Sequence, residues 1–314
     1  MPVPDQPRPG PPLGRRPVPP PGRRAAGSAG IRAAGPIGSL IELIKVSDDA
    51  WGLGGTAVLG TGSSPLVLLN RIAFLDPDKE KLHDGGKQAL LRWACQHRLG
   101  QDAELIRRVG ERRDAALRVL SARRHVVRLL VEPEWRLAVG LGSTANAHEI
   151  SIALHGTYGW PVLPGSGLKG LAAAWAVAAG TVAAADIGRV LGSPRPGAAA
   201  HQDAARGTVC FLDGFPAGAA VRVEADVLTP HVKPYYDGVA SGNLVPPAEY
   251  HNPVPVMFLT VRGAFWVDLY GENREDTEAA ADWLTEAGDD LGAGAKTAAG
   301  YGYLAVSRRE KTPA

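Results

Sequence analysis

The sequence predicts an α+β protein, and three observations support that fold class. From about residue 124 onward, short strand-like runs alternate with two stretches of helical periodicity. Residues 78–124, which come before them, have a helical pattern. The chain has 314 residues, of which 45% are hydrophobic and 21% charged, so it is long and apolar enough to bury a sizeable core.

The first 36 residues differ in composition from the rest. They are dominated by Pro, Gly, Ala and Arg, with paired arginines at 15–16 and 23–24. Such a segment cannot bury enough apolar surface to offset the entropy of ordering, so we expect residues 1–36 to form a disordered tail. A solvated arm is the simpler interpretation of its arginines, and contact with RNA is the alternative.

Residues 37–123 are expected to form a partly helical extension beside the main domain. The structure of residues 37–76 is ambiguous, because glycines break their apolar runs. Further on, one helical face is apolar and the other faces are basic, which predicts a solvated surface, with a basic stripe for RNA as the alternative. The apolar face holds Leu105, Val109, Ala116 and Leu120, and the basic faces hold Arg107, Arg108, Arg112, Arg113, Arg118, Arg123 and Arg124.

Residues 124–314 are expected to form one domain with a ferredoxin-like plan. Without its insertions, this region has the order strand, helix, strand, strand, helix, strand, which is the βαββαβ (RRM-like) arrangement. The expected elements are strands at 126–131, 135–139 and 149–154, a helix at 172–179, a loop insertion at 192–206, strands at 208–212 and 220–228, a long loop at 227–250, strands at 254–261 and 264–270, a helix at 277–291 and a last strand at 301–306.

Charge and cysteine content exclude several functional classes. The net charge is only +2, so any nucleic-acid surface must be local. The two cysteines, Cys95 and Cys210, cannot form a disulfide framework or a zinc cage, and they fit a reducing cytoplasm. No apolar run is long enough to span a membrane, and the N-terminus has no apolar region of the kind found in signal peptides. We expect a cytoplasmic protein without cofactor or metal.

A glycine-rich stretch near the C-terminus, LGAGAKTAAGYG from Leu291, contains the first candidate site. A nucleotide-binding P-loop is excluded, because Ala295 precedes the lysine and because the loop follows a helix and leads into a strand. Exposed backbone N–H groups in such a loop can bind anions, whereas a purely structural turn is the simpler alternative. The candidate RNA contacts here are Gly294, Lys296, Thr297, Gly300, Tyr301 and Gly302.

Two further stretches carry candidate contacts. The segment LPGSGLKGL from Leu163 leads into a helix, so its N–H groups and Lys169 favour a phosphate, with Ser166 as the expected N-cap. A simple glycine turn is the alternative. In the second stretch, aromatic side chains beside cations suit stacking on bases, although a packed aromatic loop is the simpler interpretation. The candidates are Gly165, Ser166, Gly167 and Lys169 in the first stretch, and His231, Lys233, Tyr235 and Tyr236 in the second.

Taken together, three motifs resemble those of the RAMP superfamily of CRISPR proteins. They are Pro164-Gly-Ser-Gly-Leu-Lys-Gly, Asp226-Val-Leu-Thr-Pro-His followed by the tyrosine pair, and Gly292-Ala-Gly-Ala-Lys-Thr-Ala-Ala-Gly-Tyr-Gly. Their order along the chain and their residues are most similar to the family of sixth Cmr subunits, which belong to type III-B effector complexes. The resemblance covers roughly residues 125–306, and the N-terminal tail lies outside it.

The resemblance implies a structural RNA-binding subunit of an antiviral ribonucleoprotein. Such a subunit caps the filament of backbone subunits near the 3′ end of the guide RNA. Its implied partners are guide and target RNA together with other RAMP backbone subunits and small subunits. Lysines and backbone N–H groups would hold guide phosphates irrespective of sequence, and base pairing would supply specificity.

Two alternatives remain open: a RAMP endoribonuclease that processes guide RNA, and a RAMP-fold module that binds proteins only. Some RAMP proteins cleave RNA without metal, using a histidine, and His155 and His231 are the candidates here. Neither has a second catalytic partner fixed by the sequence. Asp226 and Asp237 are expected to be structural, and His83-Asp84 lacks the other metal ligands of a phosphohydrolase site. We expect no independent nuclease activity.

Overall fold

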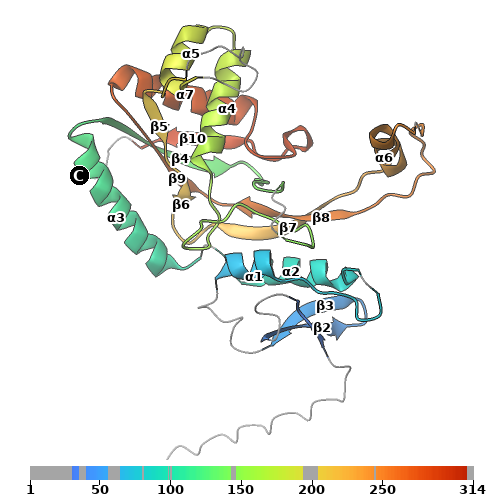
Figure 1. Ribbon diagram of the computed structural model, residues 1–314. Helices are drawn as coiled ribbons and strands as arrows, with labels where there is room; N and C mark the ends of the chain where they lie inside the picture. The colour runs from blue at the N-terminus through green and yellow to red at the C-terminus, as the bar shows by residue number, and fades with distance from the viewer. Residues whose placement is uncertain are drawn as a thin grey trace, which may run out of the picture.

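The computed structural model describes residues 30–34, 40–55, 64–79, 81–97, 99, 101–142, 146–193, 204–243 and 245–309. Over these residues the protein is α+β, which confirms the predicted class. Its strands form a three-stranded, a five-stranded and a two-stranded sheet, and all pairs between named strands are antiparallel. In Figure 1 the two-stranded sheet lies between the other two.

The five-stranded sheet is the centre of the larger part of the molecule. Its order is β10-β4-β9-β5, and β6 also pairs with β9. Side chains alternate between the two faces of a strand, so Leu129 and Val131 of β4 are buried on the same face as Val267, the cross-strand partner of Leu129. The strands are β4 His125–Pro133, β5 Val209–Phe211, β6 Phe215–Pro216, β9 Phe265–Gly271 and β10 Leu304–Arg308.

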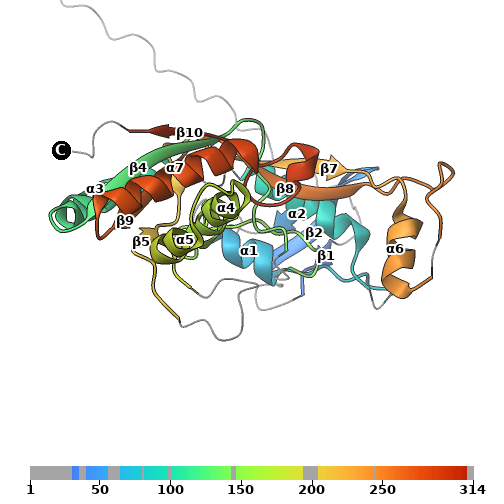
Figure 2. The same cartoon turned by 90° about the horizontal axis from the view of Figure 1, so that it is seen from above.

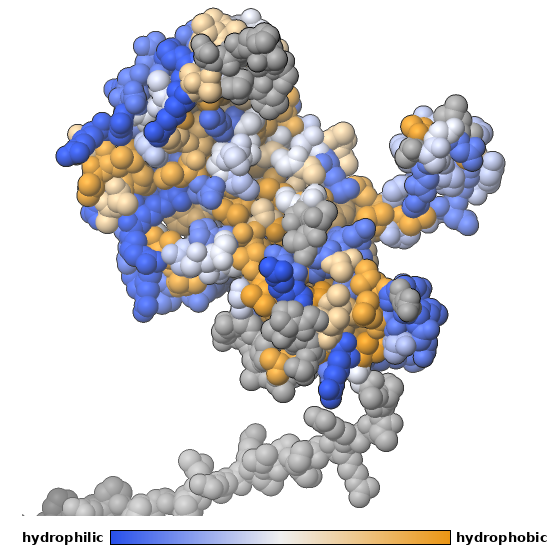
Figure 3. Space-filling view, viewed as in Figure 1, coloured by the Kyte–Doolittle hydropathy of each residue, from blue (hydrophilic) through white to orange (hydrophobic). Residues whose placement is uncertain are grey.

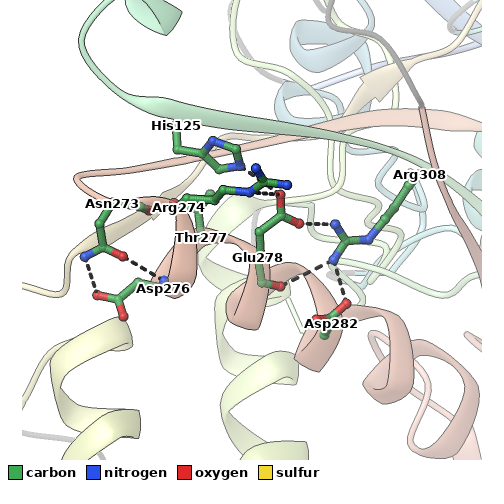
Figure 4. Close-up of polar contacts among 8 residues, drawn as sticks. All are labelled: His125, Asn273, Arg274, Asp276, Thr277, Glu278, Asp282 and Arg308. Carbon is green, nitrogen blue, oxygen red and sulfur yellow. Dashed lines mark hydrogen bonds and ion pairs between the residues drawn. The ribbon is translucent and has the colours of Figure 1, made fainter.

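Helix α7 (Arg274–Asp290) packs on this apolar face with Ala280, Leu284 and Ala287 buried. Helix α4 (Gly165–Ala178) crosses α7, and α5 (Ala184–Leu191) follows it (Figures 1 and 2). Helix α7 begins where Asn273 accepts a hydrogen bond from the Asp276 N–H at 2.8 Å. Figure 4 shows that Glu278, two residues after Asp276, lies between His125 of β4 and Arg308 of β10. These contacts join the helix to both strands.

Helix α3 (Ala103–Ser121) covers the opposite face of the sheet, and its buried side agrees only in part with the predicted one. Leu105 and Val109 of the predicted face pack partly buried against Ile106, whereas Ala116 is exposed. The buried side chains are Ile106 and Leu117. Arg113 of this helix donates to the fully buried Asp268 at 2.5 Å, and Arg128 donates to the same carboxylate at 2.6 Å. The sequence pattern failed here because charged residues face inward, where they pair, and apolar periodicity does not detect them.

The N-terminal part is a three-stranded sheet, in the order β1-β2-β3, with two helices. Helix α2 packs on β3 and also on β7, so it joins this part to the rest. The predicted tail extends too far, because residues 31–32 pair with β2 as strand β1. Residues 1–29 lie outside the described part. The elements are β1 Ile31–Arg32, β2 Ile41–Ser47, β3 Ala50–Gly55, α1 Pro65–Arg71 and α2 Asp84–Gln96.

Strands β7 (Arg222–Leu228) and β8 (Val256–Arg262) form a ribbon that carries helix α6 (Lys233–Ser241). In Figure 3 the α6 region stands clear of the body, and the stem that joins it has an apolar surface. The prediction of a continuous loop over 227–250 was wrong. Its prolines suggested a loop, but Pro234 lies in the first turn of α6, where a helix needs no N–H donor.

Residues 149–154 do not form the predicted strand. Glu149 has a left-handed backbone with φ of 57°, and the segment makes only an isolated bridge between Leu154 and Pro161. Its alternation was nevertheless predicted correctly, since Ile150 and Ile152 are buried. Within the described part of the chain, the helices are all too short or too polar to cross a bilayer.

Candidate nucleic-acid interface

The glycine-rich loop is held against the core by its own backbone. The Ala293 N–H donates to Gly302 O at 2.7 Å, and the Gly302 N–H donates to Arg136 O at 2.8 Å. The Ala295 N–H donates to Ala138 O at 2.7 Å. A side chain at Gly302, where φ is 82°, would clash with Ala293 O. Several N–H groups expected to face a phosphate are therefore used inside the protein, and the loop's main polar contribution to its surface is the side chain of Lys296.

Lys296 lies at the edge of a hollow of about 480 Å³. Its backbone is left-handed, with φ of 66°, and its Nζ lies 4.8 Å from the centre of the Phe258 ring. A second lysine, Lys87 of α2, lines the same hollow. We call it the Lys296 hollow, and its lining comprises Lys87, Leu141, Gly142, Asn146, Glu149, Ser151, Val256, Met257, Phe258 and Lys296.

The wall formed by residues 146–151 is fixed from both sides. His148 Nε2 accepts a hydrogen bond from the Phe74 N–H at 3.0 Å, and Asn146 donates to Leu69 O. On the other side, the Ser151 hydroxyl donates to Gly140 O at 2.6 Å. Burial lowers the pKa of His148, and the nearby charges of His83 and Lys87 lower it further, so this histidine is neutral and serves as an acceptor.

The sequence did not predict Lys87 or Glu149 as members of the site. Lys87 lies on α2, which is about 210 residues before the glycine-rich loop, and only the packing of α2 brings the two together. Glu149 is in a segment that the sequence assigned to a strand. No local motif marks either residue, because the hollow exists only after the N-terminal part has packed on the rest.

Tyr301 is buried, so its ring is not a surface on which a base can stack. It lies 4.8 Å from the Trp135 ring, and its hydroxyl donates to Asp226 at 2.8 Å. Burial and this hydrogen bond raise the pKa of Tyr301 to about 12. Burial opposes ionisation of Asp226, but hydrogen bonds from Tyr301, the Val227 N–H and Arg136 hold its pKa below the ordinary value. Asp226 is therefore a structural acceptor.

The Pro164 motif forms the start of helix α4, but Ser166 is not its N-cap. Pro164 occupies that position, and the Gly165 N–H donates to the Asp213 carboxylate at 2.7 Å. The Gly167 N–H donates to Pro164 O at 2.9 Å. A carboxylate of the protein thus already occupies the helix N-terminus that the sequence assigned to a phosphate.

Lys169 lines a separate hollow of about 430 Å³ between α4 and the region after α5. Ser166 and Arg206 share this lining, and the described wall continues through Leu191, Gly192 and Ser193. We call it the Lys169 hollow. It shares no residue with the Lys296 hollow, so the two glycine–lysine motifs line different surfaces.

The third candidate segment lies at the end of the ribbon. Lys233 forms an ion pair with Asp237, and His231 is exposed. The rings of Tyr235 and Tyr236 meet edge to face with centroids 5.5 Å apart, and Tyr236 is 61% exposed. The Tyr236 ring is therefore open to solvent and could stack on a base. The charge of Lys233 is already partly neutralised by Asp237.

Two of the histidines considered for catalysis, His155 and His83, are held in structural roles. His155 Nδ1 accepts a hydrogen bond from the Thr157 N–H at 3.1 Å, and its ring packs against Tyr158 and Trp160. His83 caps helix α2 by accepting from the Gly85 N–H at 3.0 Å. Among the described residues, no group of three or more His, Cys, Asp or Glu side chains could hold a metal ion.

Comparison with known proteins gives a sequence relative. No family model matches the chain. Over 104 residues it is 39% identical to the CRISPR system Cmr subunit Cmr6 of Pyrococcus furiosus. Over this stretch the chain is similar to a Cmr6 subunit. The matched stretch covers 31% of this chain and 30% of the relative's length.

A solved structure with low sequence identity shares the fold. A chain of the type III-B Cmr-beta complex bound to cognate target RNA superposes with a TM-score of 0.54 at 17% identity, over 71% of each chain. This likeness shows a shared fold. The crystal structure of Cmr6 from Pyrococcus furiosus also matches, at 27% identity and a TM-score of 0.34, over 58% of this chain and 98% of that one.

Proposed function

We propose that this chain is a non-catalytic, guide-RNA-binding subunit of a type III-B CRISPR (Cmr) effector complex, which caps the backbone filament near the 3′ end of the guide RNA. The observation that carries the proposal is the 39% identity to a Cmr6 protein over 104 residues. Its partners would be guide RNA, target RNA and the other backbone and small subunits.

The sheet order supports a ferredoxin-like core for this subunit. Helix α4 connects β4 to β5, and α7 connects β9 to β10, while the antiparallel order is β10-β4-β9-β5. A βαββαβ chain folded in this way has its first and third strands in the centre. We assign residues 124–314 to this RAMP domain. The extension would begin at β1 rather than at residue 37, because β1 pairs with β2.

Phosphate contacts would come from lysines rather than from a nest of free N–H groups. Most of the glycine loop's donors bind protein carbonyls, but Lys296 projects into a hollow with Lys87. Such contacts bind RNA irrespective of sequence, as a guide-holding subunit requires. Lys169 and the α6 segment with Tyr236 would add weaker contacts, the latter by stacking.

RNA cleavage is not part of the proposal. A general base needs an unprotonated ring nitrogen that faces the substrate. In His155 the unprotonated nitrogen of the neutral ring is Nδ1, which already accepts backbone N–H groups, so Nε2 carries the proton. His231 has no acidic or basic partner within the described segments. The geometry gives no support to the endoribonuclease alternative.

One experiment separates the three functional classes. The purified full chain is incubated with labelled guide RNA in EDTA, and both mobility shift and cleavage are scored across a salt series. The proposal predicts a shift that weakens with salt and intact RNA. Cleavage lost in His155→Ala or His231→Ala would favour the endoribonuclease. Absence of binding at low salt would favour the protein-interaction module.

A further inference from the structure

The Lys296 hollow contains both of the strained non-glycine residues in the described part of the chain. Glu149, with φ of 57°, and Lys296, with φ of 66°, are the non-glycine residues there with positive φ, and both line this hollow. Left-handed backbone is unfavourable for residues with a Cβ atom, and such residues concentrate at ligand sites. Packing alone would have been satisfied by glycine at either position.

The charges of the hollow are also uncompensated by the protein. Within the described residues, Lys87 and Lys296 take part in no ion pair, whereas Lys79 pairs with Asp76 and Lys81 with Asp84. Glu149 is exposed and likewise forms no ion pair. The hollow thus presents two ammonium groups and one carboxylate to solvent beside an apolar wall of Leu141, Val256 and Met257.

A ligand for this arrangement must satisfy opposite demands. Two ammonium groups attract a phosphate, whereas a carboxylate beside a phosphate is repulsive unless the ligand donates a hydrogen bond to it. In RNA, the hydroxyl group nearest to each phosphodiester is the ribose 2′-OH, which is a donor that DNA lacks. The volume of about 480 Å³ lies within the range of small-molecule sites and admits one nucleotide unit.

We propose that the Lys296 hollow binds a single ribonucleotide unit of the guide RNA. The phosphodiester lies between Lys87 and Lys296, the 2′-OH donates to the Glu149 carboxylate, and the apolar wall packs against the sugar or base. The N-terminal extension is thereby part of the RNA site through Lys87, and Glu149 selects RNA over DNA. This inference rests on the proposed function and specifies its ligand.

The site is built before RNA arrives. His148, Asn146 and Ser151 fix the wall that carries Glu149 to the N-terminal part on one side and to residue 140 on the other. The closed loop backbone fixes Lys296. A prearranged site loses little entropy on binding, so single substitutions should change affinity without changing the fold.

The test measures dissociation constants of the full chain for one single-stranded RNA and for the DNA of the same sequence, across a salt series. Lys87→Ala is expected to weaken binding of both about tenfold and to reduce the salt slope by about 0.7, the value for one lost phosphate contact on a single strand. Glu149→Ala is expected to lower the RNA-to-DNA preference about tenfold, partly because DNA binds more tightly once the carboxylate is gone.

Lys79→Ala and Glu286→Gln are matched controls, because each makes the same or a similar charge change outside the hollow. Both should leave affinity and preference unchanged. If the unmodified chain binds RNA but Lys87→Ala keeps its affinity and slope, the inference is overturned and the proposed function stands. An unchanged RNA-to-DNA preference in Glu149→Ala overturns the role of Glu149. A chain that binds no RNA overturns both the proposed function and the inference.

Discussion

The Lys296 hollow and the Lys169 hollow begin with similar sequence motifs, a lysine among glycines, yet they differ in what they offer an anion. At the Lys169 hollow, the nearby helix N-terminus already binds the Asp213 carboxylate. At the Lys296 hollow, a second lysine arrives from α2, and strained backbone holds Glu149 and Lys296 in place. The comparison teaches that a glycine–lysine motif does not define an anion site by itself, because the fold decides which donors and charges surround it.

The largest expected effect is on RNA binding by the double variant Lys87→Ala/Lys296→Ala. Two phosphate contacts are lost, so affinity should fall about 100-fold, equivalent to about 2.7 kcal/mol. Fluorescence anisotropy with labelled RNA measures it. The matched control is Lys79→Ala/Lys81→Ala, two exposed lysines that line neither hollow. Equal losses of RNA affinity in both double variants would mean that RNA responds only to the net charge of the protein and not to the Lys296 hollow.

Asp213→Ala tests why the Lys169 hollow is expected to bind anions less well than the Lys296 hollow. The substitution removes the acceptor for the Gly165 N–H, so the free energy of unfolding should fall by about 1 kcal/mol, as for loss of a helix cap. Thermal unfolding followed by circular dichroism measures it. Because the helix N-terminus is then free, added sulfate should stabilise this variant more than the unmodified chain. Equal stabilisation by sulfate would contradict the explanation.

Glu149→Gly should make the protein more stable and less selective. Glycine adopts the left-handed backbone without the penalty of roughly 1 kcal/mol that a Cβ atom brings, so the unfolding midpoint should rise by about 2–4 °C. The preference for RNA over DNA should fall in the same variant. Glu286→Gly, inside helix α7, should instead be destabilising. A less stable Glu149→Gly protein would show that the left-handed backbone of Glu149 does not cost stability.

Lowering the pH should loosen the wall of the Lys296 hollow. Because the folded pKa of His148 lies below the ordinary 6.5, the unfolded chain binds more protons between the two values. Stability therefore rises with pH through this window and is lost as pH falls from about 6.5. Comparing unfolding midpoints of the unmodified chain and His148→Gln from pH 7.5 to 5.5 measures the contribution, which should disappear in the variant. A parallel decline in the unfolding midpoints of both proteins would exclude His148 as the cause of the pH dependence.

Lys169→Ala should have the smallest effect of the series. We expect a loss of RNA affinity of less than about threefold, in the range of an exposed charge that is screened by solvent. Anisotropy at the same salt concentration as for the Lys87→Ala/Lys296→Ala variant gives a direct comparison. A tenfold loss would reverse the ranking of the two hollows.

Much of the fold could be predicted because it depends on local patterns. The strands around Leu129 and Val267, and the helix with Ala280 and Leu284, have clear apolar periodicity. Helix α6 was missed because Pro234 resembles a loop signal. The buried face of α3 was predicted only in part, because Arg113 points inward to Asp268.

The site could be predicted only in part, for a different reason. Lys296 was proposed from its motif and lines the hollow, but Lys87 and Glu149 reach this hollow through tertiary packing alone. Gly165 was assigned to phosphate because helix N-termini favour anions, yet the anion that binds there is Asp213, whose position no local pattern reveals. Burial of Tyr301 beneath Trp135 was equally invisible from the sequence.

The most direct test of the central claim is the salt dependence of RNA affinity in Lys296→Ala and Lys169→Ala, measured side by side. If the Lys296 hollow holds a guide phosphate, the slope of log affinity against log salt should become shallower by about 0.7 in Lys296→Ala and change much less in Lys169→Ala. The opposite result, with an unchanged slope in Lys296→Ala and a reduced one in Lys169→Ala, would contradict the account.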